Sequence, residues 1–260
     1  MAQRFALSAL APLLLAGCQN SNFGMPDSAT VVGGETARLW RIFFIVALAV
    51  GALVLGLIAW SVIAYRRKGA ELPKQTHANI PMEVVYTVIP VVIVIVLFAA
   101  TMSTLAKTER KSSRPDLVIE TTGFQWQWRF HYPAHDIDVL GATGRPPVMV
   151  VPTGKTVRIV LTSTDVIHGF FVPEFMVKHD AIPGRKTTFD LNLKKAGTFE
   201  SGRCTVFCGL DHDRMSFIVK AVSPASFEAW AAKNKAQNQA LTSKQSPPET
   251  TDPNQGVPAN

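Results

Sequence analysis

Two cysteines, a histidine and a methionine lie within twelve residues, in the segment CTVFCGLDHDRM from Cys204 to Met215. The chain has one other cysteine, Cys18, near its N-terminus. Thiolate, imidazole and thioether groups are the ligands that a soft copper centre prefers, and two thiolates on one loop can bridge two metal ions. Spacing alone also allows a disulfide between Cys204 and Cys208, and zinc would accept two cysteines and two histidines but not Met215. The segment therefore predicts a copper site, with a disulfide and zinc as alternatives.

Such a copper site needs a second histidine from elsewhere in the fold. His168 is the leading candidate, in the segment STDVIHGFFVP at the end of the strand-like run TVRIVLTS. Residues 116–222 form short runs of aromatic and β-branched residues, broken by turn signals such as Pro152–Gly154. This pattern predicts an antiparallel sandwich or barrel of about 100 residues, in which that strand end can lie beside the cysteine loop. The segment SPASFEAWAAKNKA then predicts a helix with Ser223 as its cap.

Two long apolar runs come before this region. Residues 42–65 contain no charged side chain, and residues 84–102 contain only Pro90 as a helix-disfavouring residue. A helix of about 20 residues spans a bilayer, and a membrane helix tolerates proline. The intervening segment is rich in Lys and Arg, which marks the cytoplasmic side. We therefore expect transmembrane helices at 40–65 and 82–104, a cytoplasmic loop at 66–81, and an exported domain after about Lys107.

Both ends of the chain differ from its middle. The start, MAQRFALSALAPLLLAGC, is typical of a bacterial lipoprotein signal, which would remove residues 1–17 and leave Cys18 lipidated at the head of an exported segment, 18–39. A plain signal peptide with an incidental cysteine is the alternative. Residues 236–260 are polar and proline-rich and predict a disordered tail. The exported part has 19 Lys or Arg against 15 Asp or Glu, and we expect no nucleic-acid partner.

Four motifs in combination resemble subunit II of the haem–copper cytochrome c oxidases, from Leu39 to about Trp230. They are EVVYTVIP, GFQWQWRFHYP, HGFFVPEFMVKHDAIPGR and CTVFCGLDHDRM, in the order of the family and after two membrane helices. The resemblance implies a two-helix transmembrane hairpin followed by an all-β cupredoxin-like Greek-key sandwich, with its C-terminal helix, at 105–235. It also implies a binuclear copper centre, CuA, in that sandwich. Matched position by position, the ligands are the side chains of His168, Cys204, Cys208, His212 and Met215 and the backbone carbonyl of Val206.

The same resemblance implies roles for other positions. Trp126 matches the residue through which electrons enter from cytochrome c, whereas a packing role is expected for Trp128. Glu83 matches an acid at the mouth of a proton pathway into subunit I, although an acid there could also face headgroups and stabilise the helix N-terminus. Asp180 and Arg185 match positions that face subunit I, with a solvated loop acid as the alternative for Asp180.

Val206 departs from the family pattern. Most members carry a glutamate at this position, and its side chain binds magnesium or manganese. A valine side chain cannot bind a hard cation, so the magnesium site is in doubt, whereas a copper role through the backbone carbonyl is unaffected.

The resemblance implies a subunit of a terminal respiratory oxidase that is not active alone. It would accept electrons from a soluble or membrane-bound cytochrome c and pass them to haem in subunit I, for oxygen reduction to water coupled to proton translocation. Subunit I and subunit III are the expected partners, in a bacterial inner (plasma) membrane with the C-terminal domain in the periplasm or outside the cell. A quinol oxidase subunit II, which lacks the copper ligands, and a membrane-anchored copper-binding or copper-delivery module are the alternatives.

Overall fold

The computed structural model describes residues 23–67, 69, 75–141 and 145–245, with side chains to residue 236. The predicted signal at 1–17, the predicted lipidation site Cys18 and residues 246–260 lie outside this description. The chain forms two compact units. One contains the helices up to Lys111 together with the turn at Pro173–Val177, and the other runs from Ser112 to Val172 and from Lys178 onward.

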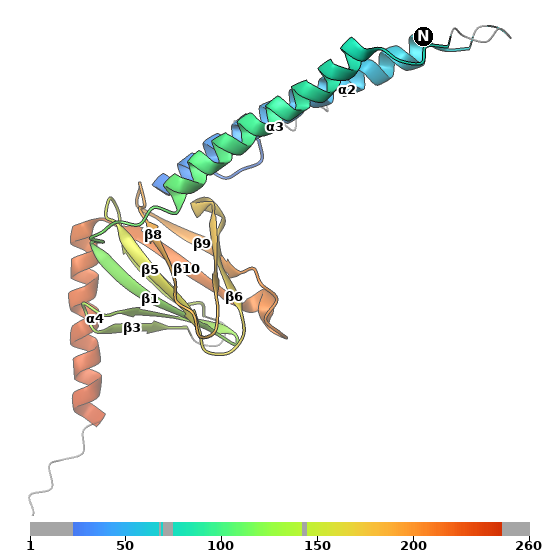
Figure 1. The fold of residues 1–260 in the computed structure, drawn as a ribbon. Helices are drawn as coiled ribbons and strands as arrows, with labels where there is room; N and C mark the ends of the chain where they lie inside the picture. The colour runs from blue at the N-terminus through green and yellow to red at the C-terminus, as the bar shows by residue number, and fades with distance from the viewer. Residues whose placement is uncertain (1–22, 68, 70–74, 142–144, 246–260) are drawn as a thin grey trace, which may run out of the picture. The chain divides into compact units, whose positions relative to one another are not determined.

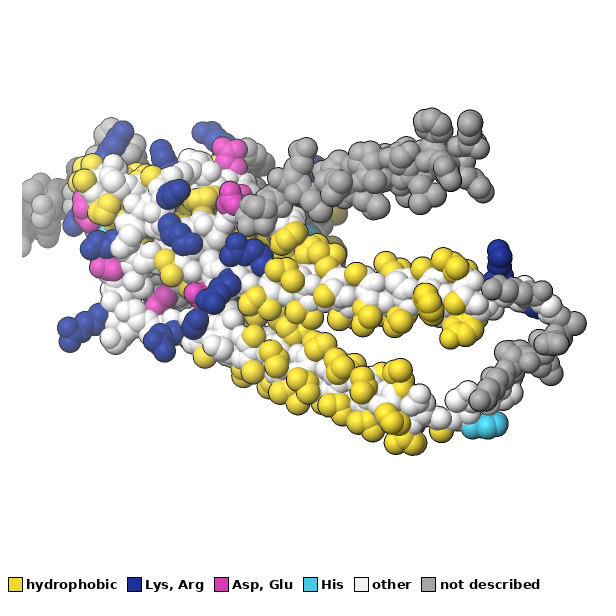
Figure 2. Space-filling model, turned by 90° about the horizontal axis from the view of Figure 1, so that it is seen from above, with side chains coloured by type: hydrophobic (Ala, Val, Ile, Leu, Met, Phe, Trp, Pro, Cys, Tyr) yellow, Lys and Arg dark blue, Asp and Glu magenta, His cyan; other side chains and the backbone are white. Residues whose placement is uncertain are grey.

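The helical unit has two long apolar helices, α2 (Val31–Ala64) and α3 (Ile80–Thr108). Their most apolar windows have mean hydropathies of 3.0 and 2.7 and are 0% buried, so both are long and apolar enough to cross a membrane. Figure 2 shows hydrophobic side chains along both helices. The ends of the helices are joined by an ion pair of 3.0 Å between Lys107 and Glu35, as expected of an antiparallel hairpin.

Helix α2 begins earlier than residue 40, where the sequence predicted its start. Thr30 acts as the N-cap, because its hydroxyl accepts a hydrogen bond of 2.9 Å from the backbone N–H of Gly33. The hydroxyl of Thr30 also donates to the backbone carbonyl of Phe175, at 3.1 Å, in the turn that belongs to this unit. The polar first turns of α2 therefore precede the apolar span.

The β unit is a sandwich of two five-stranded sheets in the described residues (Figure 1). The first sheet has the order β3-β2-β1-β5-β8, with β1 (Leu117–Phe124), β2 (Gln127–Tyr132), β3 (Ile137–Leu140), β5 (Val157–Ser163) and β8 (Thr187–Leu191). The second has the order β4-β10-β9-β6-β7, with β4 (Val148–Pro152), β6 (His168–Val172), β7 (Val177–Ala181), β9 (Gly197–Cys204) and β10 (Ser216–Val222). The predicted all-β sandwich is confirmed.

The expectation of a purely antiparallel arrangement is wrong. Strand β1 pairs with β5 in parallel, and β4 pairs with β10 in parallel. Among the described strands, the chain changes sheets at every step from β3 to β6, and again from β7 to β8 and from β8 to β9. These crossings bring strands that are distant in sequence side by side, and a turn signal between two strands does not reveal them.

Large aromatic side chains fill the space between the sheets. Trp128, Phe170 and Phe217 are 0% exposed, and the rings of Phe170 and Phe217 stack with centroids 4.6 Å apart. The hydroxyl of Tyr132 on β2 donates to the carbonyl of Val150 on β4, at 3.0 Å, and accepts from its N–H, at 2.8 Å. Two hydrogen bonds thus join the two sheets inside the core, and burial raises the pKa of Tyr132. The packing role expected for Trp128 agrees with its position.

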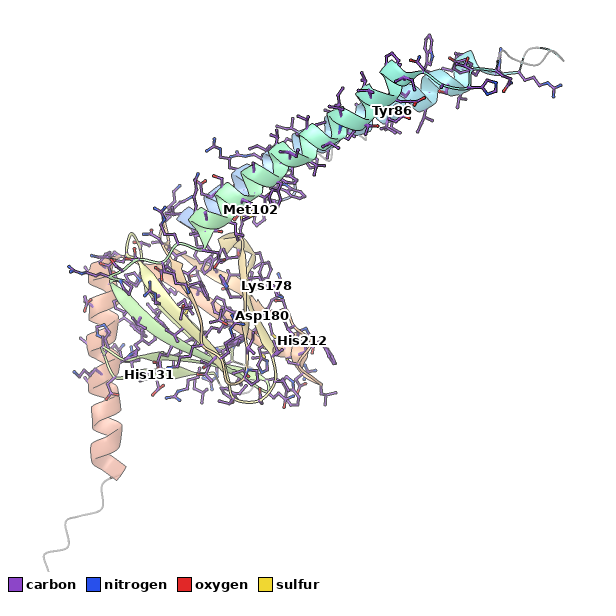
Figure 3. The ribbon with its side chains drawn as sticks, in the orientation of Figure 1. Tyr86, Met102, His131, Lys178, Asp180 and His212 are labelled. Carbon is purple, nitrogen blue, oxygen red and sulfur yellow. The ribbon has the colours of Figure 1, made fainter. Side chains whose placement is uncertain are left out.

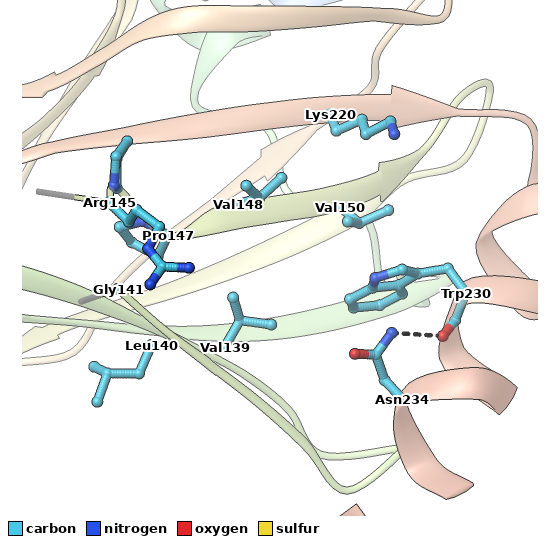
Figure 4. Close-up of a pocket in the computed structure, with 11 residues that line it drawn as sticks. Val139, Leu140, Gly141, Arg145, Pro147, Val148, Val150, Lys220, Trp230 and Asn234 are labelled. Atoms are coloured by element: carbon cyan, nitrogen blue, oxygen red, sulfur yellow. Dashed lines mark hydrogen bonds between the residues drawn. The ribbon is translucent and has the colours of Figure 1, made fainter. Parts of the chain in front are cut away.

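Helix α4 (Pro224–Gln245) follows the last strand, and Ser223 caps it by accepting from the N–H of Ser226 at 3.2 Å. Trp230 packs edge-on against Tyr132, with ring centroids 5.1 Å apart, and lines a surface cavity of about 490 Å³ between α4, β3, β4 and β10 (Figure 4). The predicted tail begins too early, because residues 236–245 continue this helix. Ala, Gln, Leu and Lys in that stretch favour a helix, and the first proline comes at Pro247.

Candidate metal centre

The cysteine loop joins the last residue of β9 to the first residue of β10. Cys204 ends β9, and Met215 directly precedes β10. The backbone N–H of Cys204 donates to the carbonyl of Met215, at 2.9 Å, which closes the base of the loop. His212 begins a short 3-10 turn, η2 (His212–Arg214), and Gly209 has a φ of +120°, a conformation that favours glycine. The loop therefore folds back on itself and turns its sulfur atoms inward.

The donor atoms of the loop converge on Cys208. Its Sγ lies 3.9 Å from Sγ of Cys204, 3.8 Å from Sδ of Met215 and 3.5 Å from Nδ1 of His212. The two cysteines and Met215 are at most 5% exposed, whereas His212 is half-buried. A soft donor set therefore surrounds the Cys208 sulfur in an almost fully buried pocket.

His168 comes from the neighbouring strand. It is the first residue of β6, which pairs with β9 so that Phe170 is opposite Cys204. The prediction that His168 lies near the loop is confirmed by the geometry, since its ligand atom and the two cysteine sulfurs lie within 4.8 Å of one another. The route differs from the expected one. Strand β5 belongs to the other sheet, and residues 164–167 cross between the sheets before His168 enters β6.

The imidazole of His168 is held from outside the cluster. Its Nε2 lies 2.7 Å from Oδ1 of Asp165, and its Nδ1 is buried without a hydrogen-bond partner. Gly123 leaves room for the ring, because a Cβ at that position would lie 3.0–3.2 Å from three atoms of His168. An unpartnered buried nitrogen beside two sulfurs is unfavourable unless it binds something, and it suits a metal.

The pKa values of the two thiols differ. Burial acts to raise the pKa of Cys204, but the neighbouring His168 and the N–H of Gly169, which donates to its Sγ at 3.3 Å, outweigh burial and lower that pKa to about 6. Burial and the adjacent Cys204 raise the pKa of Cys208 to about 12. Burial also acts to lower the pKa of His168, but Cys204 and Asp165 raise it above its ordinary value. Cys204 is therefore the more acidic of the two thiols, and a bound cation would take the place of the protons on both.

The donor set fits copper. Both cysteines are free, with sulfurs too far apart for a bond of about 2.05 Å, so the disulfide alternative is not formed here. Thiolates, imidazoles and a thioether suit copper and leave no role for the thioether in a zinc site. The carbonyl oxygen of Val206 lies 3.2 Å from Sγ of Cys204, so it faces the cluster, as the resemblance implied. The side chain of Val206 has no oxygen and therefore cannot bind magnesium.

The comparisons with known proteins decide the family. A family profile described as "Cytochrome C oxidase subunit II, periplasmic domain" matches residues 144–222, and "Cytochrome C oxidase subunit II, transmembrane domain" matches residues 18–103. A probable cytochrome c oxidase subunit 2 of Streptomyces coelicolor is 39% identical over 255 residues, covering 82% of this chain and 80% of that protein. The chain belongs to the cytochrome c oxidase subunit II family.

A second relative agrees with this assignment. The cytochrome c oxidase subunit 2 of Mycobacterium bovis is 31% identical over 308 residues, covering 93% of this chain and 84% of that protein. The crystal structure of the periplasmic domain of subunit II (CoxB) of Bradyrhizobium japonicum is 36% identical. It covers 49% of this chain and 99% of that chain, with a TM-score of 0.45. As a subunit II, this protein is membrane-anchored with a periplasmic domain.

Trp126 lies against the cysteine loop of this subunit II. Its Nε1–H donates to the backbone carbonyl of Cys208 at 3.3 Å, and the amide of Gln125 donates to the same oxygen at 2.7 Å. A Cβ on Gly209 would lie 3.2 Å from the indole, so the ring contacts the loop closely. The indole is half-buried. Trp126 is therefore partly exposed at the surface and is also hydrogen-bonded to Cys208, a residue of the donor cluster.

The other predicted site residues lie outside the cluster. Glu83 is in the first turn of α3, where its Oε1 accepts from the N–H of Asn79 at 3.1 Å while the side chain of Asn79 accepts from the N–H of Met82. This reciprocal pair resembles a capping box and gives Glu83 the structural role that the sequence left open. Its proton role remains a prediction.

Asp180 is on β7, an edge strand of the second sheet, and pairs with Lys178 at 3.1 Å (Figure 3). Arg185 is exposed in the turn between β7 and β8. Both are therefore available to a partner surface, and their contact with subunit I remains a prediction.

Sequence reasoning missed Asp165, Gln125 and Gly123. Asp165 stands three residues before His168, and a carboxylate that holds a ligand histidine is a common partner in metal sites. That rule would have found it. Gln125 contacts Cys208, 83 positions later, and Gly123 contacts His168, 45 positions later. Neither the residue types nor the spacing indicates these contacts.

Proposed function

We propose that this subunit II holds a binuclear copper centre and accepts electrons for a terminal oxidase. Cys204 and Cys208 would bridge two copper ions, His168 and His212 would each provide a nitrogen, and Met215 and the Val206 carbonyl would complete the set. The bound copper pair supplies one-electron redox chemistry. The convergence of four other side-chain donors on Cys208 carries this proposal.

The protein around the cluster suits electron transfer. Trp128, which is fully buried, lies edge-on to His168 with ring centroids 6.1 Å apart, and the aromatic core continues behind it. Such packing restrains the ligands on one side. On the loop side, the ligands are restrained by the hydrogen bond from Cys204 to the Met215 carbonyl and by those from Gln125 and Trp126 to the Cys208 carbonyl. A cluster whose ligands move little between charge states exchanges electrons quickly.

We further infer that reduced cytochrome c docks over the loop and delivers its electron through Trp126. Next to the cluster, Phe207 and Leu210 are 82% and 87% exposed, and Val166 and Ile167 are about two-fifths exposed. These apolar side chains support a donor held largely by apolar contacts. From the copper pair the electron would pass to haem in subunit I, within a bacterial inner membrane.

Copper content with optical and EPR spectra tests the proposal on the full chain in detergent. Two coppers per chain, with one unpaired electron shared between both, are expected. One copper with a blue-copper spectrum, or zinc in its place, would refute it. Quinol oxidase subunits II lack the copper ligands, so copper binding also separates that alternative. A copper-delivery module would give up its copper to an acceptor protein and would not co-purify with a haem-bearing subunit.

A further inference from the structure

Basic side chains gather where α2 begins and α3 ends. They are Arg38, Arg41, Lys107, Arg110 and Lys111, and all five are exposed. The ion pair between Lys107 and Glu35 places both helix ends together, and α3 leads from there into the periplasmic domain. Residues 31–41 and 107–111 contain only two acidic residues, Glu35 and Glu109. We call these five cations the periplasmic basic collar.

The collar opposes the usual charge asymmetry of membrane proteins. Lys and Arg near a membrane helix favour the cytoplasmic side, and the loop at 66–81 has four of them. The collar carries five on the opposite side, where they work against insertion with the β domain in the periplasm. Charges that are unfavourable for topology are expected to bind something once the chain is in the membrane.

The depth of the collar matches the lipid headgroups. The uncharged span starts at Ile42, directly after Arg41. Trp40, between Arg38 and Arg41 in sequence, is 40% exposed, and tryptophan prefers the membrane–water interface. Arginine side chains at this depth extend toward the phosphates, which a guanidinium can bind with two parallel hydrogen bonds.

We propose that the periplasmic basic collar binds the phosphate groups of anionic phospholipids in the periplasmic leaflet. Arg38 and Arg41, which flank Trp40 in sequence, form the headgroup contact on α2, and the cations at and just after the end of α3 add a positive field next to it. The exposed apolar side chains below, beginning with Ile42 and Phe43, lie along the acyl chains. An acidic protein surface would not need the interfacial tryptophan or the apolar face beneath it.

Spin-labelled lipids test this in the full chain, reconstituted into phosphatidylcholine vesicles. EPR measures the fraction of labelled phosphatidylglycerol, and separately of labelled phosphatidylcholine, that is immobilised at the protein. The wild-type chain is expected to prefer phosphatidylglycerol. Arg38→Gln with Arg41→Gln should lower that preference, by up to about fivefold for each cation removed, and added salt should also lower it. Arg38→Lys with Arg41→Lys keeps the charge and should retain most of the preference.

The matched control is Lys233→Gln with Lys235→Gln, which removes two exposed cations from α4 and should leave the preference unchanged. An unchanged preference in the doubly Gln-substituted collar would overturn the proposal and indicate that these cations pair with protein. An equal fall in the α4 control would overturn it as well, since only net charge would then matter. Copper content and proteolytic pattern check that each variant is inserted and folded.

Discussion

Oδ1 of Asp165 lies 2.7 Å from Nε2 of His168, and this contact leaves Nδ1 as the imidazole nitrogen available to a metal. The carboxylate is itself held in place. The backbone N–H of Gln125 donates to its Oδ2 at 2.7 Å, and the N–H of Val166 donates to its Oδ1 at 2.6 Å. Burial acts to raise the pKa of Asp165, but the hydrogen bond with His168 and these two N–H groups lower it, so the group is a carboxylate. A fixed negative charge therefore stands directly behind one proposed ligand.

Replacing Asp165 separates its charge from its positioning role. Asp165→Asn keeps an acceptor for the ring but removes the charge that stabilises the oxidised centre. The reduction potential should rise by tens of millivolts, on the order of 1 kcal/mol for a partly exposed charge, with copper retained. Asp165→Ala also frees the ring and should lower copper occupancy. Potentiometric titration and copper analysis distinguish the two, and an Asn variant with the wild-type potential would contradict the charge effect.

Trp126 and Cys208 form a second such relationship, through the hydrogen bond of 3.3 Å between Nε1–H and the carbonyl. Trp126→Leu removes the ring and should slow electron transfer from reduced cytochrome c by about tenfold or more, while the optical spectrum of the copper changes little. Trp126→Phe keeps a ring but loses the N–H and should be intermediate. Stopped-flow oxidation of cytochrome c by the assembled oxidase measures both. Wild-type rates in the Leu variant would exclude this route.

The sequence predicted the ligand set better than the path that assembles it. Cys204, Cys208, His212 and Met215 are local, so their spacing alone places them on one loop. His168 was predicted because a second histidine was needed near a strand end, but the sheet that carries it depends on crossings that no local pattern records. The parallel pairs β1/β5 and β4/β10 were missed for the same reason.

The predicted ends of α2 and α4 differ from the observed ones, because hydropathy and composition do not record where a helix is capped or continued. The apolar run predicts where α2 enters the membrane, but Thr30 and Gly33 begin the helix before that point. At the other end of the chain, polar composition predicted disorder from residue 236, whereas Ala and Gln continue α4 up to Gln245. Composition thus predicts which part of a helix lies in the membrane or in solvent, but it does not predict the residues at which the helix begins and ends.

Gly123 tests the steric part of the site. An added Cβ would lie 3.0 Å from Cδ2 of His168, closer than most real contacts, and His168 is fully buried with little freedom to move. Gly123→Ala should therefore displace the imidazole, lower copper occupancy and destabilise the fold by about 1–3 kcal/mol. Gly197→Ala is the matched control in a strand, since its Cβ would meet only Phe199, at 3.8 Å. Copper titration and thermal unfolding measure the effects, and equal copper binding by both variants would show that the contact relaxes without cost to the site.

Met215 tests the order of importance among the proposed ligands. Its Sδ lies 3.8 Å from Sγ of Cys208 and is almost fully buried, but a thioether is a weak, neutral ligand that tunes potential more than it holds metal. Met215→Leu should keep both coppers and raise the reduction potential, because a donor to the oxidised form is lost. A rise of about 50 mV corresponds to roughly 1 kcal/mol for one electron, and it would slow the transfer to haem in subunit I. Cys204→Ser and Cys208→Ser each remove one of the two proposed bridging thiolates and should abolish the binuclear signal. Redox titration followed by EPR makes the comparison. Loss of copper from the Leu variant as complete as from the Ser variants would reverse this order, and an unchanged potential would remove Met215 from the ligand set.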